Sequence, residues 1–297
     1  MRNCIFRYVG FLAAVSLGVP VLAQPMRCSQ GTVVGTYALS YDGTVLATAP
    51  GTSQTIPIPL AGLAVVSIDP SGAMWAVGVQ NTGANSMQMP FMPAGTMAVN
   101  SDCTGAVNWN PGMGTATMII LGDGEELNTM MTQCGPAAGG PCVIHGTWKR
   151  IYRWPSTVDV AHCSPVGVFG TYVYRQNGYI MVPAAGSPLP ASVPFTTLGF
   201  ASFGYDGAAQ GNGTVSTGGQ TRQYGIANGN IQAKSDCTGT FTANFISQGV
   251  NLGQFQAWFV ALDGGNQIWA IGTQDPSGKP VALGTMTRVS YMPMPGK

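Results

Sequence analysis

The chain contains an internal duplication. Residues Cys28–Tyr37 (CSQGTVVGTY) return as Cys163–Tyr172 (CSPVGVFGTY), and the pentapeptide Ser101–Gly105 (SDCTG) returns unchanged as Ser235–Gly239. The first pair is displaced by 135 residues (163 minus 28) and the second by 134 (235 minus 101). A repeat unit of this length is the size of an ordinary domain, so the sequence predicts two equivalent domains in tandem.

The first 23 residues have the pattern of a secretory signal peptide. Arg2 and Arg7 precede an apolar stretch, Val9–Leu22, that ends at the small residue Ala23, after which we expect cleavage. The stretch is short for a membrane span, and no transmembrane span is expected after cleavage. The predicted organisation is a signal peptide (1–23), a first β-barrel repeat (24–153), a linker (154–162) and a second β-barrel repeat (163–297). Such a protein is secreted, periplasmic or at the cell exterior, and the short linker predicts that its two units touch.

Composition and turn formers predict an all-β fold. The chain has 42 Gly and 21 Pro, yet hydrophobic residues make up 45% of it. Apolar segments with frequent turn formers are typical of many short strands, and no stretch shows helical periodicity. About eight strands are expected per repeat, and a hairpin-linked antiparallel sheet of that size can close on itself. We therefore expect two tandem up-and-down eight-stranded antiparallel β-barrels, with β-sandwiches as the alternative.

Hairpin turns are expected where Gly follows Asp or Asn and within the repeated pentapeptide. The expected turns are Asp42-Gly43, Asp69–Gly72, Ser101–Gly105 and Gly122–Gly124 in the first repeat, and Asn177-Gly178, Asp206-Gly207, Ser235–Gly239 and Asp263–Gly265 in the second. The segment Phe255–Leu262 is apolar on both of its alternating faces. This pattern predicts a strand with the barrel core on one side and a neighbouring unit on the other.

The cysteines predict three disulfides. Cys4 lies in the predicted signal peptide, which leaves six cysteines in an exported chain. Because equivalent units should have equivalent disulfides, the repeat predicts Cys28–Cys103 and Cys163–Cys237. Cys134 and Cys142 have no counterparts in the second copy and flank a Gly- and Pro-rich segment, which predicts a third bridge that closes a short loop.

Each repeat begins with a Gly-x-Tyr and ends with an Arg in a Gly-Thr segment. Tyr37 and Tyr172 lie on the expected first strands, and Arg150 and Arg288 lie on the expected last strands. This pattern resembles the calycins, and also bacterial barrels of the allene oxide cyclase type. The resemblance implies that each Arg packs over its Tyr where the barrel closes, through cation–π and stacking contacts. We interpret these four residues as structural.

Methionines are concentrated in one segment of the first repeat, Met87–Met97 (MQMPFMPAGTM). Thioethers select Cu(I), and Met87 and Met89 share one face of a strand. The segment therefore presents Met87, Met89 and Met92 as a candidate metal site. The alternative is core filling by flexible apolar side chains. The second repeat has no equivalent cluster, so a duplicated copper site is not expected.

Composition also narrows the classes of function. Without Arg2 and Arg7, the formal net charge falls from +1 to −1, which disfavours nucleic acid as a partner. Charged residues are 8% of the chain, against about 25% in average domains, and so weakly charged a surface permits self-association. No Gly-x-Ser-x-Gly motif is present, and Glu125 and Glu126 point to opposite sides of a strand, which does not suit paired glycosidase carboxylates.

We therefore expect no catalytic residues and no cofactor. The favoured function is an exported, non-catalytic binding or interaction protein that holds an apolar small molecule in a barrel lumen. Two alternatives stay open: a cyclase or isomerase of the allene oxide cyclase-like class, and a periplasmic Cu(I)-binding protein that uses the methionine segment.

Overall fold

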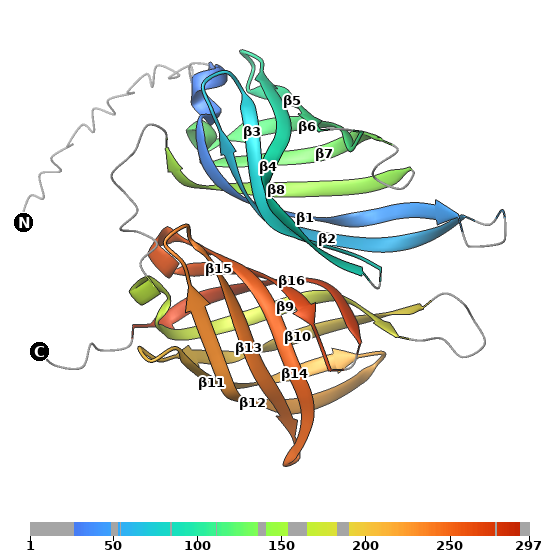
Figure 1. Ribbon diagram of the computed structural model, residues 1–297, viewed down its shortest axis with the longest axis vertical. Helices are drawn as coiled ribbons and strands as arrows, with labels where there is room; N and C mark the ends of the chain where they lie inside the picture. The colour runs from blue at the N-terminus through green and yellow to red at the C-terminus, as the bar shows by residue number, and fades with distance from the viewer. Residues whose placement is uncertain are drawn as a thin grey trace, which may run out of the picture.

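The chain folds into two closed eight-stranded antiparallel β-barrels (Figure 1). The computed structural model describes residues 27–48, 53, 55–83, 85–110, 112–135, 141–153, 165–182, 190–276 and 278–291. In each barrel, successive strands pair as hairpins and the last strand pairs with the first. This closed pairing confirms the predicted fold class and excludes the sandwich alternative. The predicted signal peptide and linker lie outside the described residues.

Six of the eight strands differ by at most one residue between the copies, whereas β5 and β6 are shorter than their counterparts β13 and β14. The first barrel consists of β1 (Gly35–Thr48), β2 (Thr55–Ile68), β3 (Ala73–Thr82), β4 (Asn85–Val99), β5 (Thr104–Trp109), β6 (Gly114–Leu121), β7 (Glu126–Cys134) and β8 (Cys142–Arg153). The second consists of β9 (Gly170–Val182), β10 (Ala191–Phe203), β11 (Ala208–Thr217), β12 (Gln220–Ala233), β13 (Thr238–Ser247), β14 (Val250–Leu262), β15 (Gln267–Gln274) and β16 (Lys279–Ser290).

Two of the expected turns are wrong. Strand β1 runs through Asp42-Gly43, and β9 runs through Asn177-Gly178, without a reversal. Both glycines allow close approach of the neighbouring strand: a Cβ on Gly43 would lie 2.0 Å from the Val143 carbonyl oxygen, and one on Gly178 would lie 2.3 Å from that of Val281. Such dipeptides often form turns. In this protein, their glycines instead allow the first and last strands of each barrel to lie close together.

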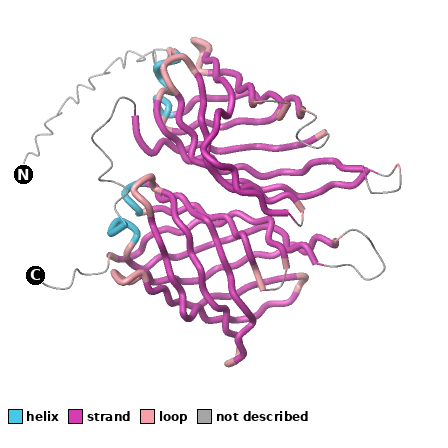
Figure 2. The backbone as a smooth tube through the Cα atoms, in the orientation of Figure 1, coloured by secondary structure: helices cyan, strands magenta, loops and turns pink. Residues whose placement is uncertain are grey.

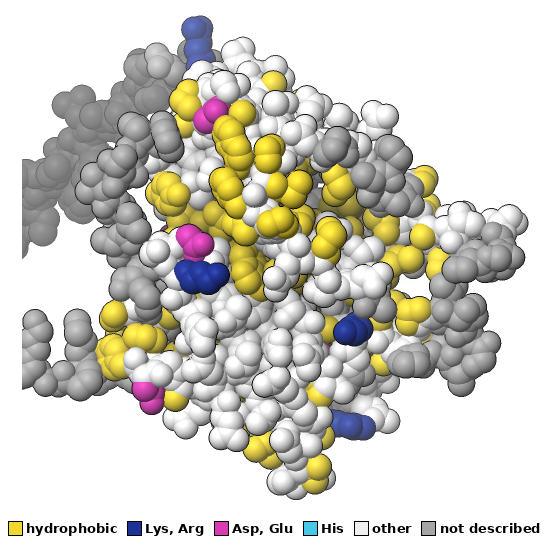
Figure 3. Space-filling model, viewed as in Figure 1, with side chains coloured by type: hydrophobic (Ala, Val, Ile, Leu, Met, Phe, Trp, Pro, Cys, Tyr) yellow, Lys and Arg dark blue, Asp and Glu magenta, His cyan; other side chains and the backbone are white. Residues whose placement is uncertain are grey.

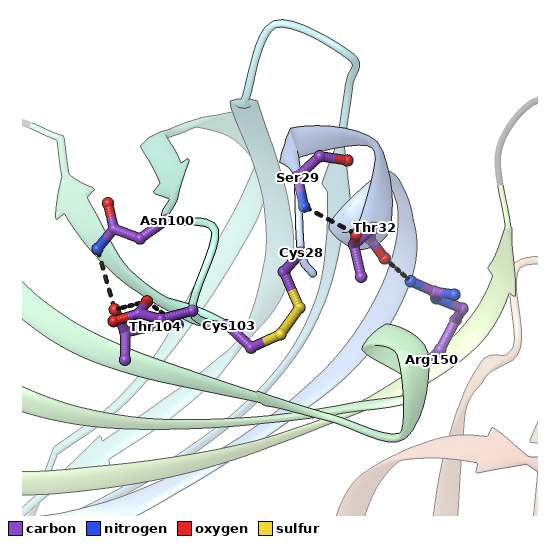
Figure 4. Close-up of a disulfide and its surroundings, with 8 residues drawn as sticks. Cys28, Ser29, Thr32, Asn100, Cys103, Thr104 and Arg150 are labelled. Carbon is purple, nitrogen blue, oxygen red and sulfur yellow. Dashed lines mark hydrogen bonds between the residues drawn. A yellow bond between two sulfur atoms is a disulfide. The ribbon is translucent and has the colours of Figure 1, made fainter. Parts of the chain in front are cut away.

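One end of each barrel is closed by short 3₁₀ helices, which Figure 2 shows on the same side of both barrels. They are η1 (Gln30–Val33) and η2 (Gly122–Gly124) in the first barrel, and η5 (Pro165–Val168) and η6 (Asp263–Gly265) in the second. In the first barrel, the Cys28–Cys103 disulfide ties the segment that leads into η1 to the turn between β4 and β5 (Figure 4). The closed end is therefore held by a covalent bond as well as by packing.

The repeated pentapeptide folds in the same way in both copies. The Asp102 carboxylate accepts hydrogen bonds from the Thr104 amide (3.0 Å) and hydroxyl (2.6 Å), and Asp236 does the same with Thr238 at the same distances. Each Asp thereby fixes the turn through its own side chain. The intervening cysteine adopts the left-handed backbone conformation, with φ of 65° at Cys103 and 66° in the second copy.

The cysteines are bonded as follows. The structure contains the Cys28–Cys103 bridge and the Cys134–Cys142 bridge. Cys237 is also disulfide-bonded. Its predicted partner, Cys163, lies outside the described residues, so that pairing stays a prediction.

An arginine from the last strand of each barrel crosses the closed end. The Arg150 guanidinium lies 5.2 Å from the Tyr37 ring centroid, and its Nε and Nη2 donate to the Tyr37 hydroxyl at 3.0 and 2.6 Å. Nη2 also donates to the carbonyl of Thr32 in η1 (Figure 4). The Tyr37 hydroxyl in turn donates to the carbonyl of Gly124 in η2 at 2.9 Å. One ion therefore holds the first strand, the last strand and both 3₁₀ helices.

The second barrel repeats this arrangement. Arg288 lies 5.3 Å from the Tyr172 ring centroid, donates to the Tyr172 hydroxyl at 3.1 and 2.6 Å, and donates to the carbonyl of Gly167 in η5. The Tyr172 hydroxyl donates to the carbonyl of Gly265 in η6 at 2.7 Å. The contacts that the family resemblance implies are therefore present in both copies.

The two barrels pack side by side through strand β2 of the first and strands β14–β16 of the second (Figure 1). The interface is apolar. Its buried members are Ala38, Ala61, Leu63, Val65 and Val79 of the first barrel, and Met181, Cys237, Val260, Leu262, Trp269, Ile271 and Val281 of the second. Asn81 is buried at this interface and donates through Nδ2 to the carbonyls of Gly272 (2.6 Å) and Pro280 (3.0 Å). The predicted contact between the units is thus extensive, and strand β14 has the two covered faces that its sequence indicates.

We predict that the two observed disulfides contribute unequally to stability. The Cys28–Cys103 bridge closes 75 residues and the Cys134–Cys142 bridge closes 8. Chain-entropy arguments give about 4 kcal/mol for the first and about 2 kcal/mol for the second. Guanidinium unfolding of the two double Cys→Ser variants measures this difference. Equal losses would show that loop closure is not the source of the stabilisation.

A second prediction concerns barrel closure. Arg150→Met should lower the free energy of unfolding by about 2–4 kcal/mol, because the Thr32 carbonyl and the Tyr37 hydroxyl lose a charged donor. Arg153 is the matched control: it is 51% exposed and makes surface ion pairs with Asp123 (3.0 Å) and Glu125 (2.7 Å). Arg153→Met should cost at most about 1 kcal/mol. Similar losses in both variants would contradict the closing role of Arg150.

Candidate ligand-binding site

The lumens of the two barrels are lined by different side chains. In the first barrel, Met74, Met97 and Met118 are buried in the core together with Trp148, and Met131 packs against them. In the second barrel, the large side chains of the corresponding core are mainly phenylalanine and tyrosine, and Met286 is the one methionine among the described residues that packs against it. The closed ends of the two barrels are alike. The two barrels therefore differ mainly in the lumen and at the open end.

Aromatic rings form a continuous series along the second lumen. Neighbouring rings lie between 4.7 and 6.1 Å apart, within the range of favourable aromatic contacts. From the closed end to the mouth, the order is Tyr172, Phe203, Phe241, Phe255, Phe245 and Tyr224. The lumen thus offers an apolar, aromatic wall that reaches the open end of the barrel.

Two cavities lie along this wall. The inner one has a volume of about 40 Å³ and is enclosed mainly by apolar side chains, among them Phe241, Phe255 and Met286. The outer one, at the mouth, has a volume of about 350 Å³, which is within the range of small-molecule sites. Gln176, Tyr224 and Phe245 line both cavities, so the two lie next to each other.

A pair of tyrosines lies between the cavities. The hydroxyl groups of Tyr174 and Tyr224 form a hydrogen bond inside the barrel. Two glycines that pair across β10 and β11 make room for them: a Cβ on Gly199 would lie 2.6 Å from the Tyr174 hydroxyl, and one on Gly213 would lie 2.4 Å from it. Counted from the equivalent tyrosines of the repeat, Tyr174 corresponds to Leu39, so this polar pair belongs to the second copy alone.

The polar groups at the mouth are mostly neutral hydrogen-bonding groups. Burial raises the pKa of Tyr224 to about 12, and the Asp275 carboxylate adds to the shift. Burial and the neighbouring Tyr224 also raise the pKa of Tyr174. Both phenols are therefore protonated near neutral pH. Arg222 lies at the rim of the same cavity.

Thr197 is the polar side chain that most directly indicates a ligand. It is 6% exposed and lines the mouth cavity. The Thr197 hydroxyl interacts with Tyr224. Its Oγ1 atom, however, makes no hydrogen bond of normal geometry with any described group. An incompletely satisfied buried hydroxyl costs about 1–3 kcal/mol, which a polar group of a bound molecule would recover.

The sequence did not point to this site. No ligand-binding residue was predicted from the sequence, because Tyr174, Thr197 and Tyr224 do not belong to any recognisable motif. The signal that could have found them is the divergence between copies: Tyr174 replaces an apolar residue at an equivalent lumen position. The pairing of Gly199 with Gly213 depends on strand register, which the sequence does not specify to a single residue.

The other predicted residues lie elsewhere. Met87 and Met89 lie on the half of β4 that is farther from η1, Met92 lies at the middle of that strand, and Met97 is buried in the core. His145, the one histidine among the described residues, lies 3.1 Å from the Asp42 carboxylate, with both side chains more than half exposed. Among the described residues, no three His, Cys, Asp or Glu side chains gather as a metal site would need.

A wider depression lies on the outer wall of the second barrel. It has a volume of about 730 Å³, and Leu198 and Phe200 line it. These side chains are exposed and alternate along β10 with the lumen-facing Thr197 and Ala201. The depression lies mainly on the outer face of the barrel, but Gln223 and Tyr224 line both it and the mouth cavity, so the two adjoin. It has less of the enclosed apolar wall that holds small molecules.

Comparisons with known proteins add little to this description. No protein-family model matches the chain, and no curated protein matches it. Among solved structures, a protein of unknown function from the DUF3598 family of Nostoc punctiforme aligns with 89% of this chain and 100% of its own, at 9% identity and a TM-score of 0.23. Transferrin-binding protein B from serogroup B Neisseria meningitidis aligns with 85% of this chain and 76% of its own, at 9% identity and a TM-score of 0.24.

OmpT, an outer membrane protein of Vibrio cholerae, aligns with 85% of this chain and 96% of its own, at 8% identity and a TM-score of 0.13. TM-scores this low carry no argument, so the class of this protein follows from its own strand pairing: a tandem pair of closed eight-stranded antiparallel barrels. Among the described residues, no helix is long and apolar enough to cross a lipid bilayer.

We predict that Gly213 is required for the tyrosine pair. Gly213→Ala should separate the Tyr174 and Tyr224 hydroxyls, leave them without a buried partner and lower the free energy of unfolding by about 1–3 kcal/mol. The control is Gly225→Ala on β12, where the nearest atom to a new Cβ is 3.8 Å away. Thermal or urea unfolding compares the two variants. If Gly213→Ala is as well tolerated as Gly225→Ala, the glycine does not make room for the pair.

Proposed function

We propose that this is an exported binding protein whose second barrel holds a small, largely apolar molecule with one polar group. The observation that carries the proposal is the mouth cavity of about 350 Å³, which combines an aromatic wall with the incompletely satisfied Thr197 hydroxyl. The apolar part of the ligand would lie against Phe195 and Phe245. Its polar group would hydrogen-bond to Thr197 and Gln176 at the mouth.

Export is supported by the covalent chemistry of the described residues. Disulfides persist in oxidising compartments, and the Cys28–Cys103 bridge is an integral part of the closed end. The sequence prediction of a signal peptide agrees with this placement. We also propose kinship with calycin-like barrels, which the Arg–Tyr closure of both copies supports.

Binding accounts for the lumen better than catalysis does. General acid–base catalysis needs a group that gives up or takes a proton near neutral pH, and burial raises the pKa of Tyr224 to about 12 and also raises that of Tyr174, so neither phenol does so. The tyrosines are thereby suited to neutral hydrogen bonding. Self-association stays a prediction; apolar side chains gather on the visible face of the first barrel (Figure 3).

The proposal is tested with 2-naphthol, an apolar probe that carries one hydroxyl. We expect one molecule to bind per chain, followed by its own fluorescence, and Thr197→Val to weaken binding by about tenfold, the effect of losing one hydrogen bond of about 1.4 kcal/mol. Thr196→Val is the matched control, because Thr196 is the neighbouring residue on the exposed face of β10. It should bind the probe as the parent does.

Two outcomes would contradict the proposal. One is unchanged affinity in Thr197→Val. The other is loss of binding in Phe200→Ser, which would place the probe in the outer depression instead of the lumen. Native mass spectrometry of the secreted protein adds an independent observation, since a resident ligand appears there as an added mass.

A further inference from the structure

The first barrel carries three methionines on β4, from near the mouth to the middle of the strand. In the pairing of β3 with β4, Met87 lies opposite Gln80, Met89 opposite Gly78 and Met92 opposite Ala76. Paired residues on neighbouring strands point to the same face of a sheet. Ala76 belongs to the core inside this barrel, so the same register directs all three methionines toward the lumen.

A bulge keeps the third methionine on this face. Met89 and Met92 are three residues apart, a spacing that would place them on opposite faces of a regular strand. Between them, however, three steps along β4 match two along β3. The extra residue in the bulge shifts the alternation of side chains by one position, so Met92 points to the same face of the sheet as Met89.

These side chains remain in contact with solvent. Met87 is 52% exposed and Met92 is 44% exposed, whereas Met97, further along the same strand, is 3% exposed. Strand β4 pairs with β5 only from Gly95 onward, so its first half has β3 as its paired neighbour in the described part of the chain. Core filling therefore explains Met97 but not the exposed Met87 and Met92; Met89, which lies between them, is partly buried.

The chemistry of the chain makes these sulfur atoms distinctive. All five described cysteines are in disulfides, so none offers a thiolate. Thioethers cannot form disulfides, and they remain available as soft ligands in an oxidising compartment. The adjoining polar groups are fixed: Tyr41 donates to Gln80 at 2.9 Å, and Gln80 donates to Thr82 at 3.2 Å. The rim that faces the methionines is thus held in place by hydrogen bonds.

We propose that Met87, Met89 and Met92 form a thioether site for a single Cu(I) ion at the mouth of the first barrel. Three sulfur ligands suit this soft monovalent ion, and they bind it without a redox step or a change in protonation. The second barrel has no such site, because Met286 is the one methionine of the described residues in its lumen. The site is independent of the proposed ligand cavity, which lies in the other barrel.

The test is an anaerobic titration of the full mature chain with Cu(I) in competition with bicinchoninate, repeated with Ag(I) as a redox-inert probe. We expect one ion to bind per chain. The double variant Met87→Leu with Met89→Leu should lower the affinity by about tenfold or more, since leucine keeps the apolar volume and removes the sulfur. X-ray absorption of the copper-bound parent should show sulfur neighbours.

Met130→Leu is the control, because Met130 is similarly exposed (57%) but pairs with His145 on the outer wall. It should leave the affinity unchanged. The proposal is overturned if the parent fails to compete with bicinchoninate, if the double variant binds Cu(I) as the parent does, or if Met130→Leu weakens binding equally. Binding of 2-naphthol should be the same in all these variants, so the two proposals fail or succeed separately.

Discussion

The architecture depends on the arginine that crosses the closed end of each barrel. A guanidinium excluded from water is costly unless its donors are satisfied, and Arg150 is 2% exposed. Its donors reach a tyrosine hydroxyl, a backbone carbonyl of η1 and the Glu125 carboxylate. Because these partners come from distant parts of the chain, the ion is satisfied only when the first strand, the last strand and the plugging helices are all in position. The requirement therefore selects the closed barrel over an open sheet.

Fixing one end leaves the other end free to change. The two copies share the Arg–Tyr contact, the pentapeptide turn and the plugging helices, and all of these features lie at the closed ends. Their lumens and mouths share much less, with methionine and tryptophan in one and phenylalanine and tyrosine in the other. A scaffold whose stability is concentrated at one end can accept different side chains at the opposite end, which is where both candidate sites are found.

The sequence predicts the scaffold better than the sites. The repeat and the turn formers suffice for two eight-stranded barrels, and Phe255–Leu262 shows by its pattern that both faces of β14 are covered. The turn predicted at Asp42-Gly43 is wrong because, in a sequence, a glycine that allows two strands to approach cannot be distinguished from a glycine that forms a turn. Tyr174 and Tyr224 are 50 residues apart, and their contact depends on register and on glycines in two further strands. Such a site is set by tertiary geometry, to which no local pattern corresponds.

The interface between the barrels has a consequence for the history of the chain. Strand β2 is buried along Leu60–Val66 on both of its faces, one by its own core and the other by the neighbouring barrel. The side-chain Nδ2 of Asn81 donates to two backbone carbonyls of the other copy. A single repeat would expose this apolar surface and leave the Asn81 amide without those acceptors, and it would be prone to aggregate. The two halves have thus become mutually dependent, and recombination that exchanged or removed one of them would have to replace a matched surface as well as a fold.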